Sequence, residues 1–278
     1  MVYIVLALLG VIFGSFINAL TWRLHEQSGL EGKKGKKAEE RRKALSIVKG
    51  RSMCSTCSHE LGPLDLIPVL SWLALRGKCR YCKAHIPDSP FIELLTGLLF
   101  VVSYAFWPVS FSGADLLKFM FWLVFLVGFI ALAVYDFNWF LLPDKIVFPL
   151  TGLAIVQVIM TAVWSRNVST ALQSAAGALI IFGLFWMLYQ VSKGSWIGGG
   201  DVKLAIILGL LAGTPFRALT VIFFASLLGT VASVPQLVKG KEGLTQRIPF
   251  GPSLLLATII VVIYGARIAT WYQGLVLR

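Results

Sequence analysis

The sequence predicts an all-α polytopic membrane protein with about eight transmembrane helices and a cytoplasmic loop domain between the first two. Of its 278 residues, 57% are hydrophobic and only 14% are charged. A soluble domain averages roughly 45–50% apolar and about 25% charged residues. The apolar residues also form long runs, such as 120–134 and 254–264. Lipid is therefore the expected solvent for most of the chain.

The first apolar segment, residues 2–22, is long enough to span a bilayer. It lacks a basic stretch before the apolar run and a small-residue cleavage site after it, so it does not read as a signal peptide. We expect a retained first helix at 1–22, a basic cytoplasmic loop at 23–89 and a membrane helical bundle at 90–278.

The bundle is expected to contain six long spans and one short apolar segment. The short segment, 202–213, has too few residues for a comfortable crossing. It is either a half-buried helix packed inside protein or a re-entrant segment, and counting it as a crossing gives eight spans. The six long spans are expected at about 91–111, 115–135, 145–165, 169–191, 218–238 and 252–272.

Basic residues indicate the orientation of these spans. The net charge is +12, and the 23–89 region holds 14 of the 25 Lys and Arg residues. With the amino terminus outside and eight crossings, 20 of the 25 face the cytoplasm and 5 face outward. Cytoplasmic loops of membrane proteins carry this excess of positive charge, which favours both the orientation and the eighth crossing. Because topology explains the basic charge, no nucleic-acid partner is expected.

Two stretches of the loop have distinct compositions. Residues 33–49 form a run of charges with few apolar anchors, which predicts a mobile or marginally helical segment near anionic headgroups. Residues 64–75 are apolar but short and include Pro68. We expect that stretch to lie at the membrane surface or to pack against the bundle.

All cysteines of the chain lie in the loop, in two Cys-x2-Cys pairs separated by 21 residues. Each pair offers two thiolates on one side of a turn, and four thiolates complete the tetrahedral shell of a structural zinc. A closed shell leaves no position for water, so the metal is expected to hold the loop together. Redox or free-thiol pairs are the alternative, and His59 or His85 can replace a ligand. The four expected ligands are Cys54, Cys57, Cys79 and Cys82.

Two carboxylates are the candidates for catalysis. Asp136 directly follows the apolar run that ends at Tyr135, and Asp201 opens the short apolar segment. The charge-derived topology places both at the cytoplasmic end of their segments. If they meet, they can share one proton, so that one activates a water while the other polarises the scissile carbonyl.

Structural roles for these acids remain alternatives. Asp201 can act as the N-cap of its helix, Asp136 can face water at the interface, and Asp144 is best explained as a cap of the next span. The three glycines before Asp201 allow close backbone approach and positive φ, so an extended substrate can pass the acid.

Several motifs occur in the order found in one family of membrane proteases. Gly198-Gly199-Gly200-Asp201 matches the GxGD motif of aspartyl proteases, and Asp136 followed by Leu142-Pro143-Asp144 resembles the second acidic motif of the type IV prepilin leader peptidases. The remaining matches are Gly14-Ser15-Phe16-Ile17-Asn18 with Arg23, the twin cysteine pairs, Ile67-Pro68-Val69-Leu70-Ser71-Trp72, Arg76-Gly77-Lys78-Cys79 and Pro249-Phe250-Gly251-Pro252.

The resemblance implies a bifunctional enzyme of the bacterial inner membrane. Such peptidases cut the short basic leader from type IV prepilins or pseudopilins, then methylate the new amino terminus with S-adenosylmethionine. Carried over to this chain, Asp136 and Asp201 would be the protease pair, and the zinc-bound cysteines would support the loop linked to methylation. The residues that contact S-adenosylmethionine stay unassigned; the candidates are Gly14, Asn18, Asp65 and Glu93.

This sequence departs from the family pattern in its loop. Asp65-Leu66 stands where the family usually has Asp-Asn, and the basic insertion around 33–49 matches no motif. Both departures fall in the half associated with methylation. The competing hypotheses are a transporter or zinc-handling protein that uses intramembrane carboxylates, and an inactive scaffold for pilus assembly. Transport carboxylates would lie near mid-bilayer, often in symmetric repeats, and no internal repeat is evident.

Overall fold

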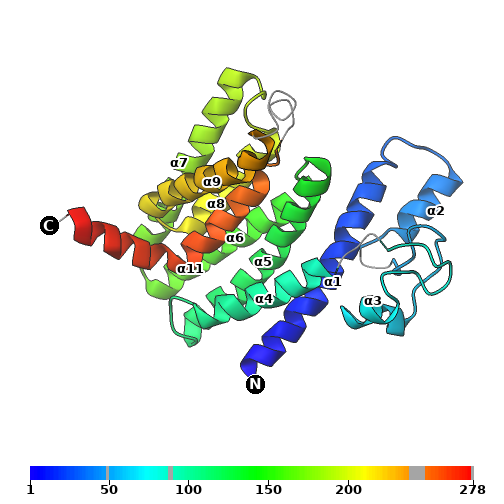
Figure 1. Ribbon diagram of the computed structural model, residues 1–278. Coiled ribbons are helices and arrows are strands. Elements are labelled where there is room, and N and C mark those ends of the chain that lie inside the picture. Colours follow the sequence, from blue (N-terminus) through cyan, green and yellow to red (C-terminus); the bar gives the residue numbers. More distant parts are fainter. Residues whose placement is uncertain (48–49, 87–89, 238–247, 277–278) are drawn as a thin grey trace. The chain divides into compact units, whose positions relative to one another are not determined.

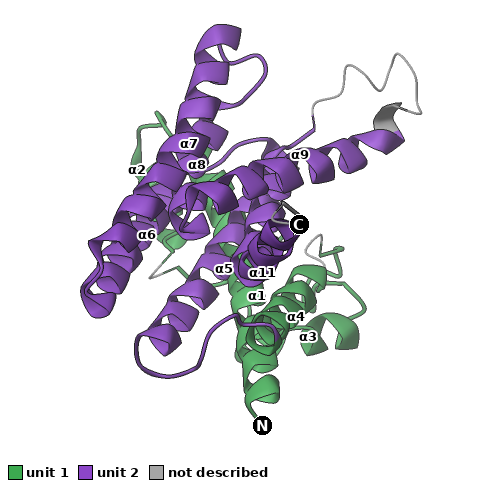
Figure 2. Ribbon diagram, turned by 90° about the vertical axis from the view of Figure 1, so that its left-hand side faces the viewer, with its two compact units in different colours: residues 1–105 green, residues 106–278 purple. Residues whose placement is uncertain are grey.

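The computed structural model describes residues 1–47, 50–86, 90–237 and 248–276. Within these ranges the chain is helical, with two isolated β-bridges and no strand. It divides into two compact units, Met1–Ala105 and Phe106–Arg278 (Figure 2).

The first unit is built on a close crossing of two apolar helices, α1 (Val2–Ser28) and α4 (Phe91–Ala105) (Figure 1). Small residues make this approach possible. A Cβ on Gly10 would lie 2.6 Å from the Cα of Gly97, and a Cβ on Gly14 would collide with the backbone of Glu93. The Gly10 and Gly14 pair has the four-residue spacing at which glycines let membrane helices pack closely.

Between α1 and α4 the chain forms short elements: α2 (Lys36–Ala44), the 3-10 helix η1 (Pro63–Leu66) and α3 (Leu70–Ala74). The basic run is thus partly helical, in agreement with the sequence, although 48–49 lie outside the described residues. Apolar side chains of η1 and α3 stay exposed, including Leu64 at 69% and Leu70 at 64%. Such exposure of neighbouring apolar side chains is expected of a segment that contacts lipid or another protein surface.

In its described residues, the second unit contains six helices: α5 (Gly113–Trp139), α6 (Asp144–Ser165), α7 (Val168–Ser192), α8 (Gly199–Ala212), α9 (Pro215–Leu237) and α11 (Gly251–Val276). The short α8 contacts α6, α7, α9 and α11. Half of its residues are buried, and a Cβ on Gly209 would collide with Ala178 of α7. It is a helix enclosed by protein, as one of the two sequence interpretations expected.

Six helices in the described ranges are long and apolar enough to cross a membrane: Val2–Ser28, Gly113–Trp139, Asp144–Ser165, Val168–Ser192, Pro215–Pro235 and Gly251–Leu275. The predicted count of eight is not confirmed. Helix α4 has 15 residues and α8 has 14, which corresponds to roughly 21–23 Å of helix against a hydrocarbon core of about 30 Å. Helix α4 stops three residues before Pro108, and a proline disfavours helical backbone in the residue preceding it.

Candidate active site and metal centre

Asp136 lies in the last turn of α5, which ends at Trp139. Its side chain is buried, and its Oδ2 accepts a hydrogen bond from the Gly251 N–H at 3.1 Å. A carboxylate near a helix C-terminus is unfavourable, because the helix dipole is negative there. Gly251 begins α11, and the first N–H groups of a helix have no partner inside it. The amino end of α11 therefore stabilises an acid that its own helix disfavours.

Asp201 lies at the third position of α8. The N-cap of that helix is Gly198, and its cap shows no side-chain hydrogen bond, so the alternative that Asp201 is the N-cap is wrong. Its carboxylate is instead close enough to Asp136 to interact with it electrostatically. Residues 65 positions apart are thus brought to one place in the second unit.

Glycines pack around the two carboxylates, where a side chain would collide with them or crowd them. A Cβ on Gly251 would collide with the carboxylate of Asp136, and one on Gly198 would lie 3.3 Å from Oδ2 of Asp201. A Cβ on Gly200 would lie 3.0 Å from Leu142, which precedes Pro143 in the α5–α6 connection. The glycines before Asp201 thus serve close approach. Positive φ is not used, because Gly198 has φ −70° and Gly199 and Gly200 are outside the positive-φ set.

Asp144 has a different role from the buried pair. It begins α6 and forms an ion pair with Lys203 of α8, with Nζ 2.7 Å from Oδ1 and both side chains about half exposed. Lys203 lies two residues beyond Asp201, so this pair ties the amino end of α6 to that of α8. The N-cap of α6 is Pro143, with no side-chain hydrogen bond at the cap, so the expectation that Asp144 caps this helix is wrong; its structural role is the ion pair with Lys203.

The four cysteines of the first unit form one cluster. Their sulfurs all lie within 4.8 Å of one another, and Cys54 Sγ is 3.8 Å from Cys82 Sγ. Four thiolates around a tetrahedral zinc, each at about 2.3 Å from the metal, lie about 3.8 Å apart. The donor set and its spacing therefore fit a metal ion.

Each Cys-x2-Cys pair sits in the same kind of turn. The Ser58 N–H donates to the Cys54 carbonyl at 2.9 Å, and the Lys83 N–H donates to the Cys79 carbonyl at 3.0 Å. Ser58 and Lys83, one residue past each pair, both have positive φ. This repeated turn aims both thiols of each pair at the same side, as the spacing predicted.

Local electrostatics favour a thiolate at Cys54. Burial alone would raise the pKa of this thiol. Hydrogen bonds from the backbone N–H groups of Cys57 and Thr56 have the larger effect, and the pKa falls to about 6. The thiolate is the form that binds metals. The two histidines proposed as substitute ligands stay outside the cluster in the part of the chain that the structure describes; His59 instead stacks on Tyr81 with ring centroids 3.7 Å apart.

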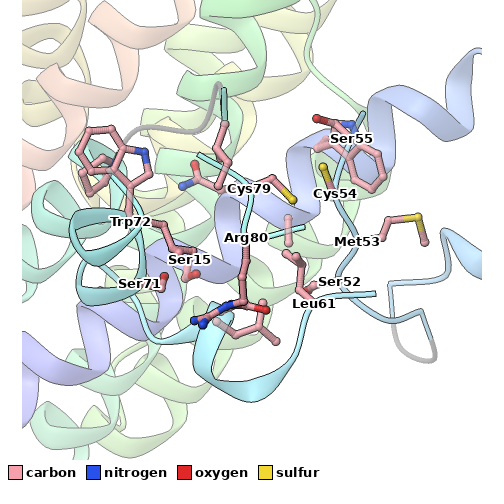
Figure 3. A pocket seen from close by; sticks show the side chains of 18 of the residues that line it. Ser15, Ser52, Met53, Cys54, Ser55, Leu61, Ser71, Trp72, Cys79 and Arg80 are labelled. Carbon is pink, nitrogen blue, oxygen red and sulfur yellow. The ribbon is translucent and has the colours of Figure 1, made fainter. Parts of the chain in front are cut away.

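A cavity of about 190 Å³ lies beside the cysteine cluster in the first unit (Figure 3). Three candidates for S-adenosylmethionine contacts line it, namely Asn18, Asp65 and Glu93; the fourth, Gly14, instead packs under Glu93. Asp65 is nearly buried and binds Arg80, with Oδ1 2.6 Å from Nε. Burial raises the pKa of Asp65, but the hydrogen bonds from Arg80, the Gly62 N–H and Tyr81 hold it below its usual range.

Sequence reasoning missed three features of these sites. It quoted Gly251 only as part of a motif, whereas the structure shows its N–H bound to Asp136. It did not predict the Asp65–Arg80 pair or the buried indole N–H of Trp72. Of the three, only the contact of Gly251 had a signal in the sequence, namely a glycine at the start of the last apolar run. The Asp65–Arg80 pair and the buried Trp72 N–H depend on how the loop folds.

The fold and its two sites define a class: a multi-pass helical membrane protein with paired carboxylates in one unit and a four-cysteine cluster in the other. Family models identify the class further. The bacterial peptidase A24 N-terminal domain matches residues 8–107, and the type IV leader peptidase family matches residues 123–234. The chain belongs to the type IV leader peptidase family and is a multi-pass protein of the bacterial inner membrane.

Similar proteins cover nearly the whole chain. The prepilin leader peptidase/N-methyltransferase of Pseudomonas aeruginosa is 34% identical over 95% of this chain and 91% of its own length. The protein of the same name from Stutzerimonas stutzeri is 32% identical over 95% of this chain and 91% of its own length. The one from Bacillus subtilis is 31% identical over 82% of this chain and 87% of its own length. No solved structure matches the chain.

Proposed function

We propose that this protein cleaves the short basic leader from type IV prepilins or pseudopilins, with Asp136 and Asp201 as the catalytic pair. The observation that carries the proposal is that these two acids, far apart in the sequence, interact with each other in the second unit. The proposal also draws on the family, whose members are named prepilin leader peptidase/N-methyltransferases.

The surroundings of the two acids stabilise negative charge at both of them. The Gly251 N–H donates a hydrogen bond to Asp136, and Asp201 lies in the first turn of α8, where the helix dipole favours an anion. The pair would therefore share one proton: the ionised carboxylate removes a proton from the attacking water, and the protonated carboxylate donates its proton toward the carbonyl oxygen of the scissile bond. Collapse of the tetrahedral intermediate breaks the C–N bond, and the leaving amine takes up a proton.

We propose that methylation of the new amino terminus is the second activity, with S-adenosylmethionine as donor. The neutral amine would accept the methyl group, and S-adenosylhomocysteine would leave as the amine loses one proton. We further propose that the cysteine cluster holds Zn²⁺ in a structural role, since four thiolates leave no open position. The bound metal would fix the two hairpins of the loop.

We propose that the amino terminus lies outside and that the active site faces the cytoplasm. The support is the charge pattern, in which 14 of 25 basic residues fall in 23–89. Prepilin leaders are basic and cytoplasmic in this scheme, so the peptidase pair and its substrate would meet on the same side.

The test is incubation of the purified protein with a prepilin and S-adenosylmethionine, followed by mass measurement of the product. Asp136→Asn and Asp201→Asn are each expected to abolish leader removal. Asp115→Asn is the matched control, because Asp115 lies at the opposite end of α5 and pairs with Lys118 at 2.9 Å. Leader removal by either active-site variant at the unsubstituted rate would disprove the assignment.

A further inference from the structure

The stretch from η1 to the end of α3 exposes apolar side chains in a loop that is otherwise polar. Residues 66–75 contain no charged side chain. Four large apolar side chains of this stretch have exposed fractions between 40% and 69%, namely Leu64, Ile67, Leu70 and Leu73. A group of exposed apolar side chains marks a surface that contacts a partner or a membrane.

Helix α3 has two different sides. Ser71 and Trp72 line the cavity of the first unit. Leu70 and Leu73 are three positions apart and therefore share one side of the helix, which is exposed. A helix with one side in water carries polar residues on that side. Because the outward side of α3 is apolar, we expect this side to be covered as well.

The position of α3 along α1 gives its depth in the membrane. The uncharged part of α1, residues 2–22, is about 32 Å long, close to the roughly 30 Å of a hydrocarbon core. Ser15 of α1 lines the same cavity as Ser71 and Trp72 of α3 (Figure 3). Ser15 lies about 10 Å before the end of the uncharged part. Helix α3 therefore lies beside the part of α1 that spans lipid.

A hydrogen bond indicates the same depth independently. The Val69 N–H, at the N-cap of α3, donates to the carboxylate of Glu93 in the first turn of α4. The backbone of Glu93 packs against Gly14 of α1, where a Cβ would collide with it. Gly14 is about 12 Å inside the end of the uncharged part of α1. In-plane membrane helices lie at comparable depths, roughly 5–10 Å into the boundary between headgroups and acyl chains.

Basic side chains border the apolar stretch. Arg76 directly follows it, Lys78 comes two residues later, and both are exposed. Within the described residues neither forms an ion pair, whereas the acids Glu60 and Asp65 of the same part of the loop are both paired. Lys and Arg beside an apolar segment extend to the phosphates of lipid headgroups. Their positive charge is complementary to an anionic membrane surface.

We propose that η1 and α3 form an in-plane membrane anchor, with Arg76 and Lys78 at the headgroup phosphates and four side chains inserted into the leaflet that borders the loop: Leu64, Ile67, Leu70 and Leu73. Lipid is the occupant because it already surrounds α1 at this depth, whereas a protein partner would have to approach from within the bilayer. The anchor holds the loop and its cysteine hairpins at the membrane surface. It depends neither on leader cleavage nor on methylation, and the proposed orientation decides only that the leaflet is the cytoplasmic one.

The first experiment identifies what contacts Leu70. The photoreactive residue p-benzoylphenylalanine replaces Leu70 in the full-length protein, which is reconstituted in phospholipid nanodiscs, irradiated and analysed by mass. Leu8 of α1 is the matched control in a membrane-spanning helix, because it is 60% exposed and Leu70 is 64% exposed. Glu60 in the first cysteine hairpin is the control outside lipid. The yield of phospholipid adduct at Leu70 should be within about threefold of that at Leu8 and about tenfold above that at Glu60.

Other products at Leu70 would overturn the inference. These are a covalent dimer, a crosslink to residues 106–278 of the same chain, or a crosslink to added prepilin that replaces the lipid adduct. The absence of a lipid adduct when Leu8 gives one has the same meaning. The probe at Leu73, on the same side of α3, repeats the test, so a folding defect of one variant does not decide the result.

The second experiment tests the basic residues. Nanodiscs contain equal amounts of phosphatidylcholine and phosphatidylglycerol with identical acyl chains, and the adducts at Leu70 are sorted by headgroup. Phosphatidylglycerol should be enriched about twofold over its share of the bilayer, and Arg76→Gln combined with Lys78→Gln should remove this enrichment. Lys43→Gln is the matched control, because Lys43 of α2 is already paired with Glu39 at 3.0 Å.

Enrichment that persists in the double variant, or that is absent without it, would overturn the role of the two basic residues. Neither measurement requires leader cleavage or methyl transfer. Failure of the proposed function would therefore leave the adducts unchanged, and failure of the anchor would leave the assignment of the two aspartates untouched.

Discussion

Gly251→Ala tests whether close approach of α11 to Asp136 is needed for leader cleavage. Gly251 is outside the positive-φ set, so alanine causes no backbone strain there. Its Cβ would nevertheless collide with Oδ2 of Asp136 and lie 3.2 Å from its Cγ. The carboxylate must move by roughly 1 Å to restore ordinary contact, and a displacement of that size can reduce a catalytic rate about 10²-fold. It would also weaken the 3.1 Å hydrogen bond from the Gly251 N–H.

The assay is the rate of leader removal at saturating prepilin, measured by mass. Gly183→Ala is the matched control, because Gly183 lies inside α7 and a Cβ there meets nothing within 4 Å. The control should retain full activity and equal or slightly higher stability, since alanine favours helix more than glycine does. Cleavage by Gly251→Ala within about twofold of the unsubstituted rate would refute the proposed positioning of Asp136.

Three further predictions concern the first unit. Cys54→Ser should remove most of the bound metal, about one zinc per chain by atomic absorption; unchanged metal content would contradict the four-thiolate site. Gly14→Ala should lower the unfolding temperature in detergent, because its Cβ would collide with the α4 backbone at Glu93; Gly183→Ala again serves as control. Asp65→Asn should destabilise the loop at neutral pH, because the lowered pKa of Asp65 shows that folding favours its charged form. That contribution is present above the ordinary pKa of about 3.9 and is lost as the pH falls through the lower folded value, so the two proteins should converge in acid. A difference that persists or grows in acid would contradict this explanation.

Composition and the length of the apolar runs were sufficient to predict most of the long helices. Long apolar runs predicted the helices α5, α6, α7, α9 and α11, because a segment in lipid must satisfy its backbone hydrogen bonds internally. They did not settle the number of crossings. Helix α4 ends at Ala105, earlier than the predicted 111, and its 15 residues do not qualify as a full span. Length alone could not show that α8 is enclosed by other helices.

The chemistry-bearing residues divide in the same way. Two Cys-x2-Cys pairs predicted one cluster, because the spacing within each pair already places two thiols on the same side of a turn. For Asp136 and Asp201 the sequence indicated only a common membrane face. Their interaction depends on packing among α5, α8 and α11, which no local pattern encodes.

By itself, then, the sequence determined that most helices lie in lipid and that the four cysteines form one metal-binding pattern, because these follow from composition and from spacing within a few residues; for the two acids it offered candidates at one membrane face. The tertiary structure alone decided what surrounds them. It brought the Gly251 N–H to Asp136 across 115 positions and left the Trp72 N–H without a partner beside a cavity. Both results arise from the packing of distant segments, where a single Cβ or a single hydrogen bond determines the geometry.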